Sequence, residues 1–211
     1  GSYVPDADLS GLDLSGIDFS GVNFPNANFA GSNLEGANLS RANLPEANFT
    51  ATNLKGANLT SAYLSSADLP GCNLEGADLT GAMMMNANLS NGNLANSTLI
   101  GAVVEGANLS GSDLLNARLK GVSSGGIIGI PLNIPLGFKM INGAILCPNV
   151  GLYEPHDFSG ADLSGLDLRD AYLEGANFTG ANLSEVDFTG AWVYRPDFTN
   201  ADLTGATFKN V

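Results

Sequence analysis

Apolar residues recur at every fifth position along most of this chain. From Leu9 to Leu119 each of these positions holds Leu or Phe, apart from Met84 and Val104, and the residue two places before it is usually Ala. Asn or Asp usually lies between the two, and turn-forming or charged residues fill the rest, as in the block ANLSR at residues 37–41. A fixed period of this kind indicates stacked, similar units whose apolar faces are buried only by their neighbours. The pattern predicts a solenoid.

The five-residue period predicts a short strand and a corner in each repeat. In extended backbone, successive side chains point to opposite sides, so Leu or Phe and Ala point inward while Asn or Asp points outward. The Ser, Thr, Gly and Pro residues at the other two positions suit turns. An amphipathic helix is excluded, because a five-residue repeat drifts around a helix of about 3.6 residues per turn instead of keeping one face.

The motif of Ala, Asn or Asp, Leu or Phe and two variable residues resembles that of pentapeptide-repeat proteins. The resemblance covers residues 4–122 and 156–209. It implies an all-β fold, a right-handed quadrilateral parallel β-helix with four pentapeptides in each coil. With 35 pentapeptides the solenoid would have about nine coils. We therefore expect one β-helix over residues 3–122 and 156–209, interrupted by an insert over residues 123–155.

The insert has its own pattern, because the repeat register is lost after Val122 and returns near His156. Two apolar runs inside it flank Asn142 and Gly143, the strongest two-residue hairpin signal, and predict a β-hairpin. The stretch before them, residues 125–135, is too apolar for a free linker. Because an isolated hairpin is only marginally stable in water, we expect the insert to pack on the flank of the rod.

The chain is acidic, with a formal net charge of −13 and only eight Lys and Arg among 211 residues. This balance argues against direct nucleic-acid binding, because neutralising phosphates requires clustered basic side chains. Residues 151–211 alone carry −7. An open coil edge there invites end-to-end homo-association, which the charge opposes at low salt. No apolar run reaches the roughly 18 residues that predict a membrane span.

Few residues suggest catalysis or metal binding. Gly-x-Ser-x-Gly occurs at residues 121–125, but this nucleophile elbow has meaning only between a strand and a helix, and no helical pattern follows. His156, the only histidine, fits a structural position better than a general base. Asp157 and Asp162 belong to a run of carboxylates five residues apart, which would diverge on adjacent sides of the implied coil. Cys72 occupies an inward position usually held by Ala, so we interpret it as a buried structural residue.

One side of the predicted coil departs from the outward Asn and Asp pattern. Counted in steps of twenty, its outward positions hold Tyr63, Met83 and Val103 in three consecutive coils. If the coil resumes on the following side after the insert, Tyr172 and Trp192 continue this apolar column. An exposed apolar strip on a polar surface usually marks a docking site. Two interpretations stay open: the hairpin folds back over the strip, or a partner binds it.

These patterns favour a non-enzymatic rigid scaffold or protein-binding module, with no catalytic, metal or cofactor site and an unidentified protein partner. The resemblance also implies an alternative, a DNA mimic that inhibits or protects DNA gyrase, as the Qnr quinolone-resistance group is understood to do. The acidic charge supports this alternative, whereas outward Asn outnumbers Asp in the middle of the chain. An enzyme with a small-molecule site under the insert is least favoured, because a filled solenoid offers no other pocket.

The first residues bear on the expected location of the protein. The chain starts at Gly1 and Ser2 without an initiator Met, so we expect that the native chain begins earlier. The cytoplasm is favoured, and a leader removed upstream would allow the periplasm or the thylakoid lumen.

Overall fold

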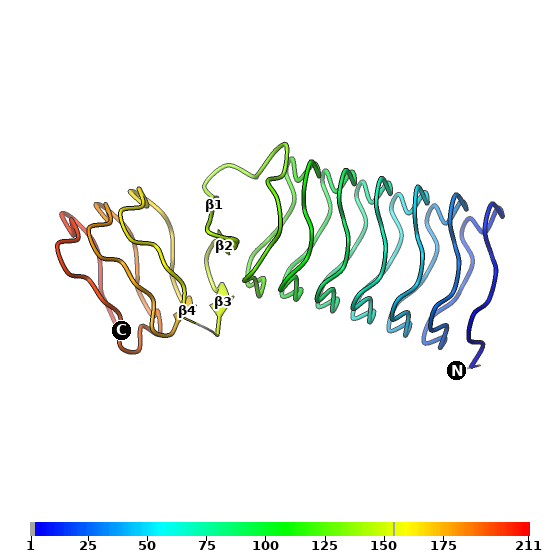
Figure 1. Cartoon of the computed structure of the whole chain (residues 1–211), viewed down its shortest axis with the longest axis horizontal. Helices are drawn as coiled ribbons and strands as arrows, with labels where there is room; N and C mark the ends of the chain where they lie inside the picture. Colours follow the sequence, from blue (N-terminus) through cyan, green and yellow to red (C-terminus); the bar gives the residue numbers. More distant parts are fainter. Residues whose placement is uncertain (1–2, 154) are drawn as a thin grey trace. The chain divides into compact units, whose positions relative to one another are not determined.

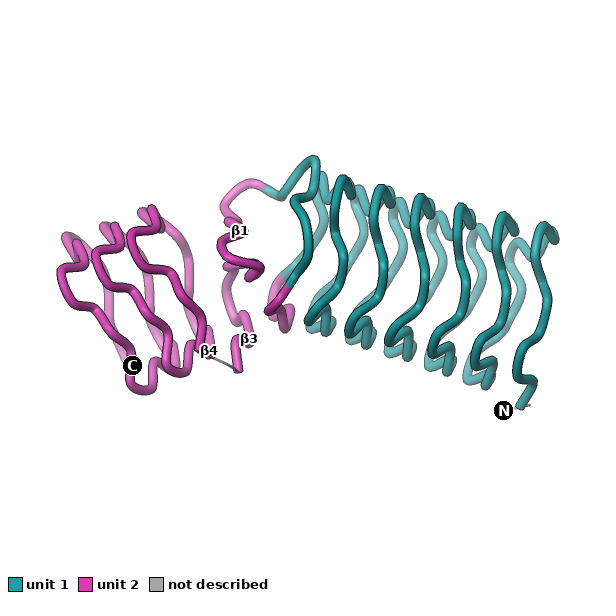
Figure 2. The backbone as a smooth tube through the Cα atoms, in the orientation of Figure 1, with its two compact units in different colours: residues 1–119, 127–135 teal, residues 120–126, 136–211 magenta. Residues whose placement is uncertain are grey.

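The chain folds into two compact units, which Figure 2 distinguishes by colour. The computed structural model describes residues 3–153 and 155–211. The first unit comprises the chain up to Leu119 together with Ile127–Pro135, and the second comprises Lys120–Gly126 and Leu136–Val211. Across the described ranges the regular structure consists of short strands and single β-bridges, without a helix.

The first unit is a parallel β-helix (Figure 1). Residues twenty positions apart pair between successive coils, so each coil has twenty residues. Parallel bridges join each coil to the next and recur every five residues, beginning at Tyr3↔Asn23. Their hydrogen bonds run in both directions: the Leu54 N–H donates to the Asn73 carbonyl at 2.7 Å, and the Asn73 N–H donates to the Thr52 carbonyl at 3.0 Å. Four bridges in twenty residues give the coil four sides.

Inward side chains form a continuous core along the first unit. All centres from Leu34 to Leu94 are fully buried. The corners require a positive φ at every fifth residue, which explains the frequent glycines, such as Gly36 at 66°. Arg41 adopts the same conformation at 56°, and its N–H donates to the Thr60 carbonyl of the next coil at 2.9 Å. The stacked backbone therefore holds corners that an isolated peptide would avoid.

The coil continues beyond the point where its sequence motif ends. The sequence places the end of the first block at Val122, whereas the structure keeps the twenty-residue pairing at Asn108↔Ile128 and Asp113↔Asn133. Pairing needs only extended backbone with available N–H and C=O groups, so it outlasts the Leu and Ala motif. Although the backbone of this stretch pairs with the preceding coil, three of its large aliphatic side chains are exposed, by 57% at Ile128, 82% at Ile130 and 74% at Leu132.

The second unit contains a shorter parallel β-helix. Strand β3 (Gly151–Leu152) pairs in parallel with β4 (Tyr172–Leu173), so coil pairing begins before the sequence motif returns. Phe158, Phe178 and Phe198 form an inward column, with ring centroids 5.4 and 5.2 Å apart. The column follows from their spacing of twenty residues, which brings equivalent positions of successive coils into register.

A hairpin precedes this second stack. Strands β1 (Lys139–Ile141) and β2 (Ala144–Leu146) pair antiparallel. Asn142 and Gly143 connect them with φ angles of 48° and 75°, both positive as a type I′ turn requires.

Side-chain hydrogen bonds anchor the hairpin within the second unit. The Asn142 Nδ2 group donates to the Asp157 carbonyl at 2.5 Å. Ser124 Oγ accepts the N–H of Ile145 at 3.0 Å and donates to the Ile145 carbonyl at 3.3 Å. Ser124 thereby extends the hairpin's pairing through a side chain.

Candidate interaction surface

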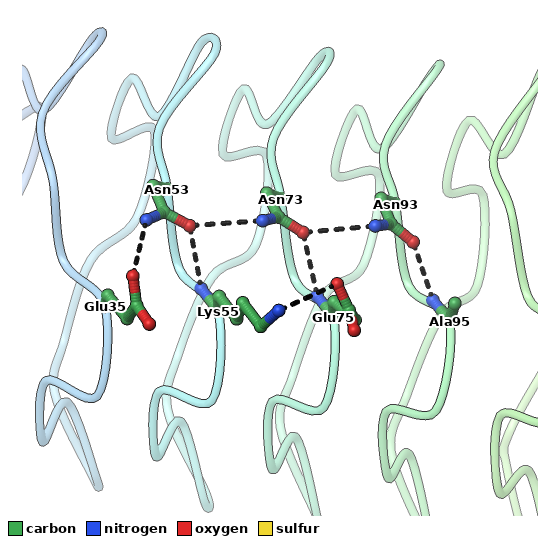
Figure 3. A network of polar contacts seen from close by, with 7 residues as sticks. All are labelled: Glu35, Asn53, Lys55, Asn73, Glu75, Asn93 and Ala95. Carbon is green, nitrogen blue, oxygen red and sulfur yellow. Dashed lines mark hydrogen bonds and ion pairs between the residues drawn. The ribbon is translucent and has the colours of Figure 1, made fainter.

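Outward asparagines form a hydrogen-bonded ladder along one side of the first unit (Figure 3). The Nδ2 group of Asn73 donates to Oδ1 of Asn53, and that of Asn93 donates to Oδ1 of Asn73, both at 3.2 Å. The Asn73 Oδ1 atom also accepts the N–H of Glu75 at 3.2 Å and closes a local turn. An asparagine amide can donate a hydrogen bond to the preceding coil and accept one from the next coil, because it carries both a donor and an acceptor. The Lys55–Glu75 ion pair beside the ladder, at 3.2 Å, is exposed and adds little stability.

Aspartate replaces asparagine where such ladders begin. Asn33 Nδ2 donates to Asp13 Oδ1 in the first unit, and Asn177 Nδ2 donates to Asp157 Oδ1 in the second, both at 3.0 Å. A carboxylate accepts these bonds but cannot donate one, so it fits the lowest-numbered coil of each described stack. Hydrogen bonds from Ser15, together with the bond from Asn33, hold the pKa of Asp13 below its usual value.

This ladder chemistry accounts for Asp157 and Asp162, two of the carboxylates that recur every five residues. Asp157 and Asp162 each accept the N–H of the serine two residues later and the Nδ2 group of the asparagine twenty residues later. Within residues 3–153 and 155–211 no three potential metal ligands cluster. The four hydrogen bonds above assign Asp157 and Asp162 to a structural role.

Three aromatic side chains form a column along one side of the second unit. The ring centroids of Tyr172 and Trp192 are 6.2 Å apart with planes 9° from parallel, and Tyr153 lies 5.1 Å from Tyr172. The absence of a side chain at Gly151 leaves room for the Tyr153 ring, because a Cβ on that glycine would lie 2.8 Å from the ring. Tyr153 is 62% exposed and Trp192 60%. We call Tyr153, Tyr172 and Trp192 the aromatic ladder.

Charged groups flank the aromatic ladder at the next corner of the coil. The Tyr172 hydroxyl donates to Glu174 Oε2 at 2.8 Å, and this bond raises the pKa of the phenol. One coil later, the guanidinium of Arg195 lies over the ring of Tyr194, 5.1 Å from its centroid. This is a cation–π contact on an exposed tyrosine. The Glu174 carboxylate and the Tyr194 ring, which Arg195 covers, therefore lie beside the aromatic ladder.

The five docking residues expected from the sequence fall in two columns. Consecutive bridges join Tyr63, Met83 and Val103 in the first unit, where Met83 is 38% exposed and the other two are half-buried. A further bridge joins Tyr172 and Trp192 in the second unit. Each column is continuous within its own unit.

Tyr153 was missed because it lies inside the expected insert. Tyr153 directly follows strand β3, which shows no Ala and Leu motif, and Gly151 occupies the outward position of that coil. The two-residue alternation of a strand is the signal that could have found it, since Tyr153 follows Gly151 by two and points to the same side.

The serines of the Gly-x-Ser-x-Gly segment form structural hydrogen bonds. Ser123 and Ser124 are 8% and 1% exposed. Ser123 Oγ donates to the Gly151 carbonyl at 3.3 Å, and Ser124 bonds the main chain of β2. The His156 ring packs beside Gly125, where Nε2 lies 3.0 Å from the position a Cβ would take. Both serine hydroxyls therefore bind main-chain groups of neighbouring segments.

Both cysteines are buried. Cys72 is 1% exposed, in the inward position that the motif predicts, and Cys147 is fully buried. Burial raises the pKa of the Cys72 thiol to about 12 and that of Cys147 to about 11. Both thiols are therefore protonated at neutral pH and poorly nucleophilic.

The repeats identify the family. A family profile described as Pentapeptide repeats matches the chain in 8 copies, over residues 6–41, 26–60, 57–94, 87–123 and 157–191. The chain is a pentapeptide-repeat protein. Proteins of this family fold as right-handed quadrilateral β-helices, the architecture built by the twenty-residue, four-sided coils described above.

Several solved structures are similar to this pentapeptide-repeat protein. HetL from the cyanobacterium Nostoc, involved in heterocyst differentiation regulation, shares 23% identity over 98% of this chain and 89% of its own, with a TM-score of 0.34. QnrB1, a plasmid-mediated fluoroquinolone resistance protein, shares 20% over 100% and 91%, with a TM-score of 0.41. A thylakoid-lumen pentapeptide repeat protein from Arabidopsis thaliana shares 35% over 53% and 71%, with a TM-score of 0.28. No curated protein matches.

The family match narrows the class of function. Pentapeptide-repeat proteins are generally structural or binding modules, and the match brings no catalytic family with it. The described part of the pentapeptide-repeat protein also contains no helix of the length and apolarity needed to cross a membrane.

Proposed function

We propose that this pentapeptide-repeat protein is a non-enzymatic binding module that holds a protein partner at the aromatic ladder. The observation that carries the proposal is the exposure of Tyr153 and Trp192 on a solenoid whose other outward positions are mostly Asn and Asp. Aromatic side chains are enriched in protein interfaces, because they bury a large area at low entropic cost. Most other outward positions of the second unit hold Asn or Asp, as at Asn177 and Asn182, so the coil itself does not depend on an outward aromatic ring.

The rigidity of the scaffold supports the same role. Tyr172 and Trp192 extend from backbone that is hydrogen-bonded to the preceding coil: the Tyr172 N–H donates to the Val150 carbonyl at 2.8 Å, and the Trp192 N–H donates to the Ala171 carbonyl at 2.8 Å. Rings fixed in this way lose little freedom when a partner binds. The ladder is thus preorganised for recognition.

A comparative capture experiment tests the proposal. The protein is immobilised and exposed to an extract of cells that express it, alongside a Tyr172→Asn, Trp192→Asn variant and a Tyr3→Asn control. Tyr3 is also an outward aromatic residue, 66% exposed, but lies in the first unit. We expect one or more proteins to be captured by the wild type and the control and lost with the double variant. Capture that is the same for all three proteins would refute the proposal.

A further inference from the structure

We propose that the aromatic ladder recognises a cationic segment of its partner, with arginine or lysine side chains set against its rings. This inference rests on the proposed function and names the chemistry of the partner. It is carried by three features of the second unit: the column of rings, the carboxylates around them, and a guanidinium that already lies over the ring of a neighbouring tyrosine.

The rings offer the electron-rich surface that a cation requires. Tyr172 and Trp192 lie nearly parallel, at 9°, with centroids 6.2 Å apart, so each covers part of the other's face, and the Tyr153 ring, tilted by 37°, lies 5.1 Å from that of Tyr172. The face of an aromatic ring carries negative potential, and tryptophan attracts cations most strongly. Trp192, at 60% exposed, presents the largest such surface of the ladder.

Carboxylates supply the complementary charge. Glu174 is fixed beside Tyr172 by the 2.8 Å bond from the phenol hydroxyl. Asp170 lies at the preceding corner, so acidic residues border the ladder at both corners. Residues 151–211 carry a net charge of −7, which attracts a cationic segment over a longer range.

The protein itself shows how a guanidinium fits this corner. Arg195 lies over the Tyr194 ring at 5.1 Å, one coil beyond Glu174. Tyr194 and Glu174 stand in equivalent positions of successive coils, because the Gly175 N–H donates to the Tyr194 carbonyl at 2.7 Å. An arginine from a partner would repeat this contact on the neighbouring rings.

The same geometry disfavours an amphipathic helix as the partner. A helix docks its apolar face into a broad hydrophobic groove. The ladder is one ring wide and is bordered by Asp170, Glu174 and Arg195. An extended cationic segment matches its width.

Trp192 provides a built-in probe, because it is the only tryptophan of the chain. Its fluorescence is followed during titration with a nine-residue peptide of alternating glycine and arginine, with a lysine version, and with a version in which uncharged citrulline replaces arginine. We expect saturable changes with the two cationic peptides and much weaker binding of the citrulline peptide. Equal binding of the arginine and citrulline peptides, or no binding of either, would overturn the proposal.

Matched variants localise the binding. Tyr172→Asn and Gly151→Ala, which displaces the Tyr153 ring, should each weaken the arginine peptide about two- to five-fold, the range of one exposed cation–π contact. Glu174→Gln should weaken it more than Glu185→Gln, the same change at another exposed corner of this unit. Equal effects of the two glutamine variants, together with no effect of Tyr172→Asn, would mean that net charge alone attracts the peptide and would overturn the proposal.

The two proposals fail separately. If the captured partner depends on the ladder but is not displaced by the arginine peptide, the cationic assignment is wrong and the binding function stands. If capture does not depend on the ladder, the proposed function is wrong, and the cationic assignment falls with it.

Discussion

Removal of the central phenylalanine of the second stack tests the packing of that unit directly. Phe178 is fully buried, and its ring lies 5.4 Å from Phe158, 5.2 Å from Phe198 and 6.1 Å from Phe188 between centroids. The substitution Phe178→Ala therefore empties a space enclosed by three other rings. Neighbouring coils are held by stacked backbone, so the cavity cannot collapse completely.

The expected cost is a large part of the stability of the unit. A buried Phe→Ala change costs about 3–5 kcal/mol. A unit of roughly 80 residues is stabilised by about 4–12 kcal/mol, at about 0.05–0.15 kcal/mol per residue. Phe178→Leu should be milder, at about 1–2 kcal/mol, because it nearly conserves volume and loses chiefly the ring contacts. The alanine variant is thus expected to bring the second unit close to unfolding.

Urea unfolding followed by Trp192 fluorescence measures this cost, because Trp192 lies in the second unit. With a slope of about 1–3 kcal/mol per molar, Phe178→Ala should lower the midpoint by at least about 1 M. The matched control is Phe49→Ala in the first unit, which is equally buried and stacks on Phe29 at 4.8 Å.

In a solenoid each coil contacts only its neighbours, so the control should leave the Trp192 transition in place while lowering the transition seen by circular dichroism. A loss below about 1 kcal/mol with Phe178→Ala would refute the packing argument. Equal shifts of the Trp192 transition by Phe178→Ala and Phe49→Ala would refute its confinement to one unit.

Three further predictions follow from burial and charge. Cys72 and Cys147, with pKa values raised to about 12 and about 11, should resist a thiol reagent at neutral pH in the native state and react in denaturant; rapid native labelling would contradict their burial. Bonds from Ser159 lower the pKa of Asp157, so its contribution to stability is complete above the unfolded value near 4 and is lost as pH falls through the lower folded value. Urea midpoints should accordingly fall less on acidification in Asp157→Asn than in the wild type, and an equal fall would count against this account. Because outward positions are mostly amides, a large excess of the protein should leave gyrase supercoiling unchanged, and inhibition would favour the DNA-mimic alternative.

The regular part of the fold was predictable because its determinants are local and periodic. Inward Ala and Leu alternate with outward Asn within a few residues, so the sides of the coil can be assigned without tertiary information. The spacing of twenty residues between Phe158 and Phe178 then correctly places their rings in one column. Cys72 follows the same rule and lies in the core.

The edges of the two stacks were not predictable in the same way. Asn108↔Ile128 and Asp113↔Asn133 pair through their backbones, and backbone pairing leaves no mark on side-chain identity. Tyr153 joins the aromatic ladder only because Gly151 leaves its column position empty, which depends on the register between distant segments. The periodicity of the sequence shows which side chains point inward or outward. The positions at the edges of the stacks depend instead on main-chain hydrogen bonds, which periodicity does not show.

The distribution of aspartate and asparagine shows that the polar side of the motif also carries structural information. Asp13 precedes Asn33 by one coil, and Asp157 precedes Asn177 by one coil, with the amide donating to the carboxylate in both pairs. Since only an amide can bond both to the coil before it and to the coil after it, aspartate suits the coil that opens a ladder. Asp157 accordingly opens a ladder in the second unit, as Asp13 does in the first. A carboxylate one coil before an amide, which composition alone reads as added acidity, therefore also serves as the acceptor that begins a row of side-chain hydrogen bonds.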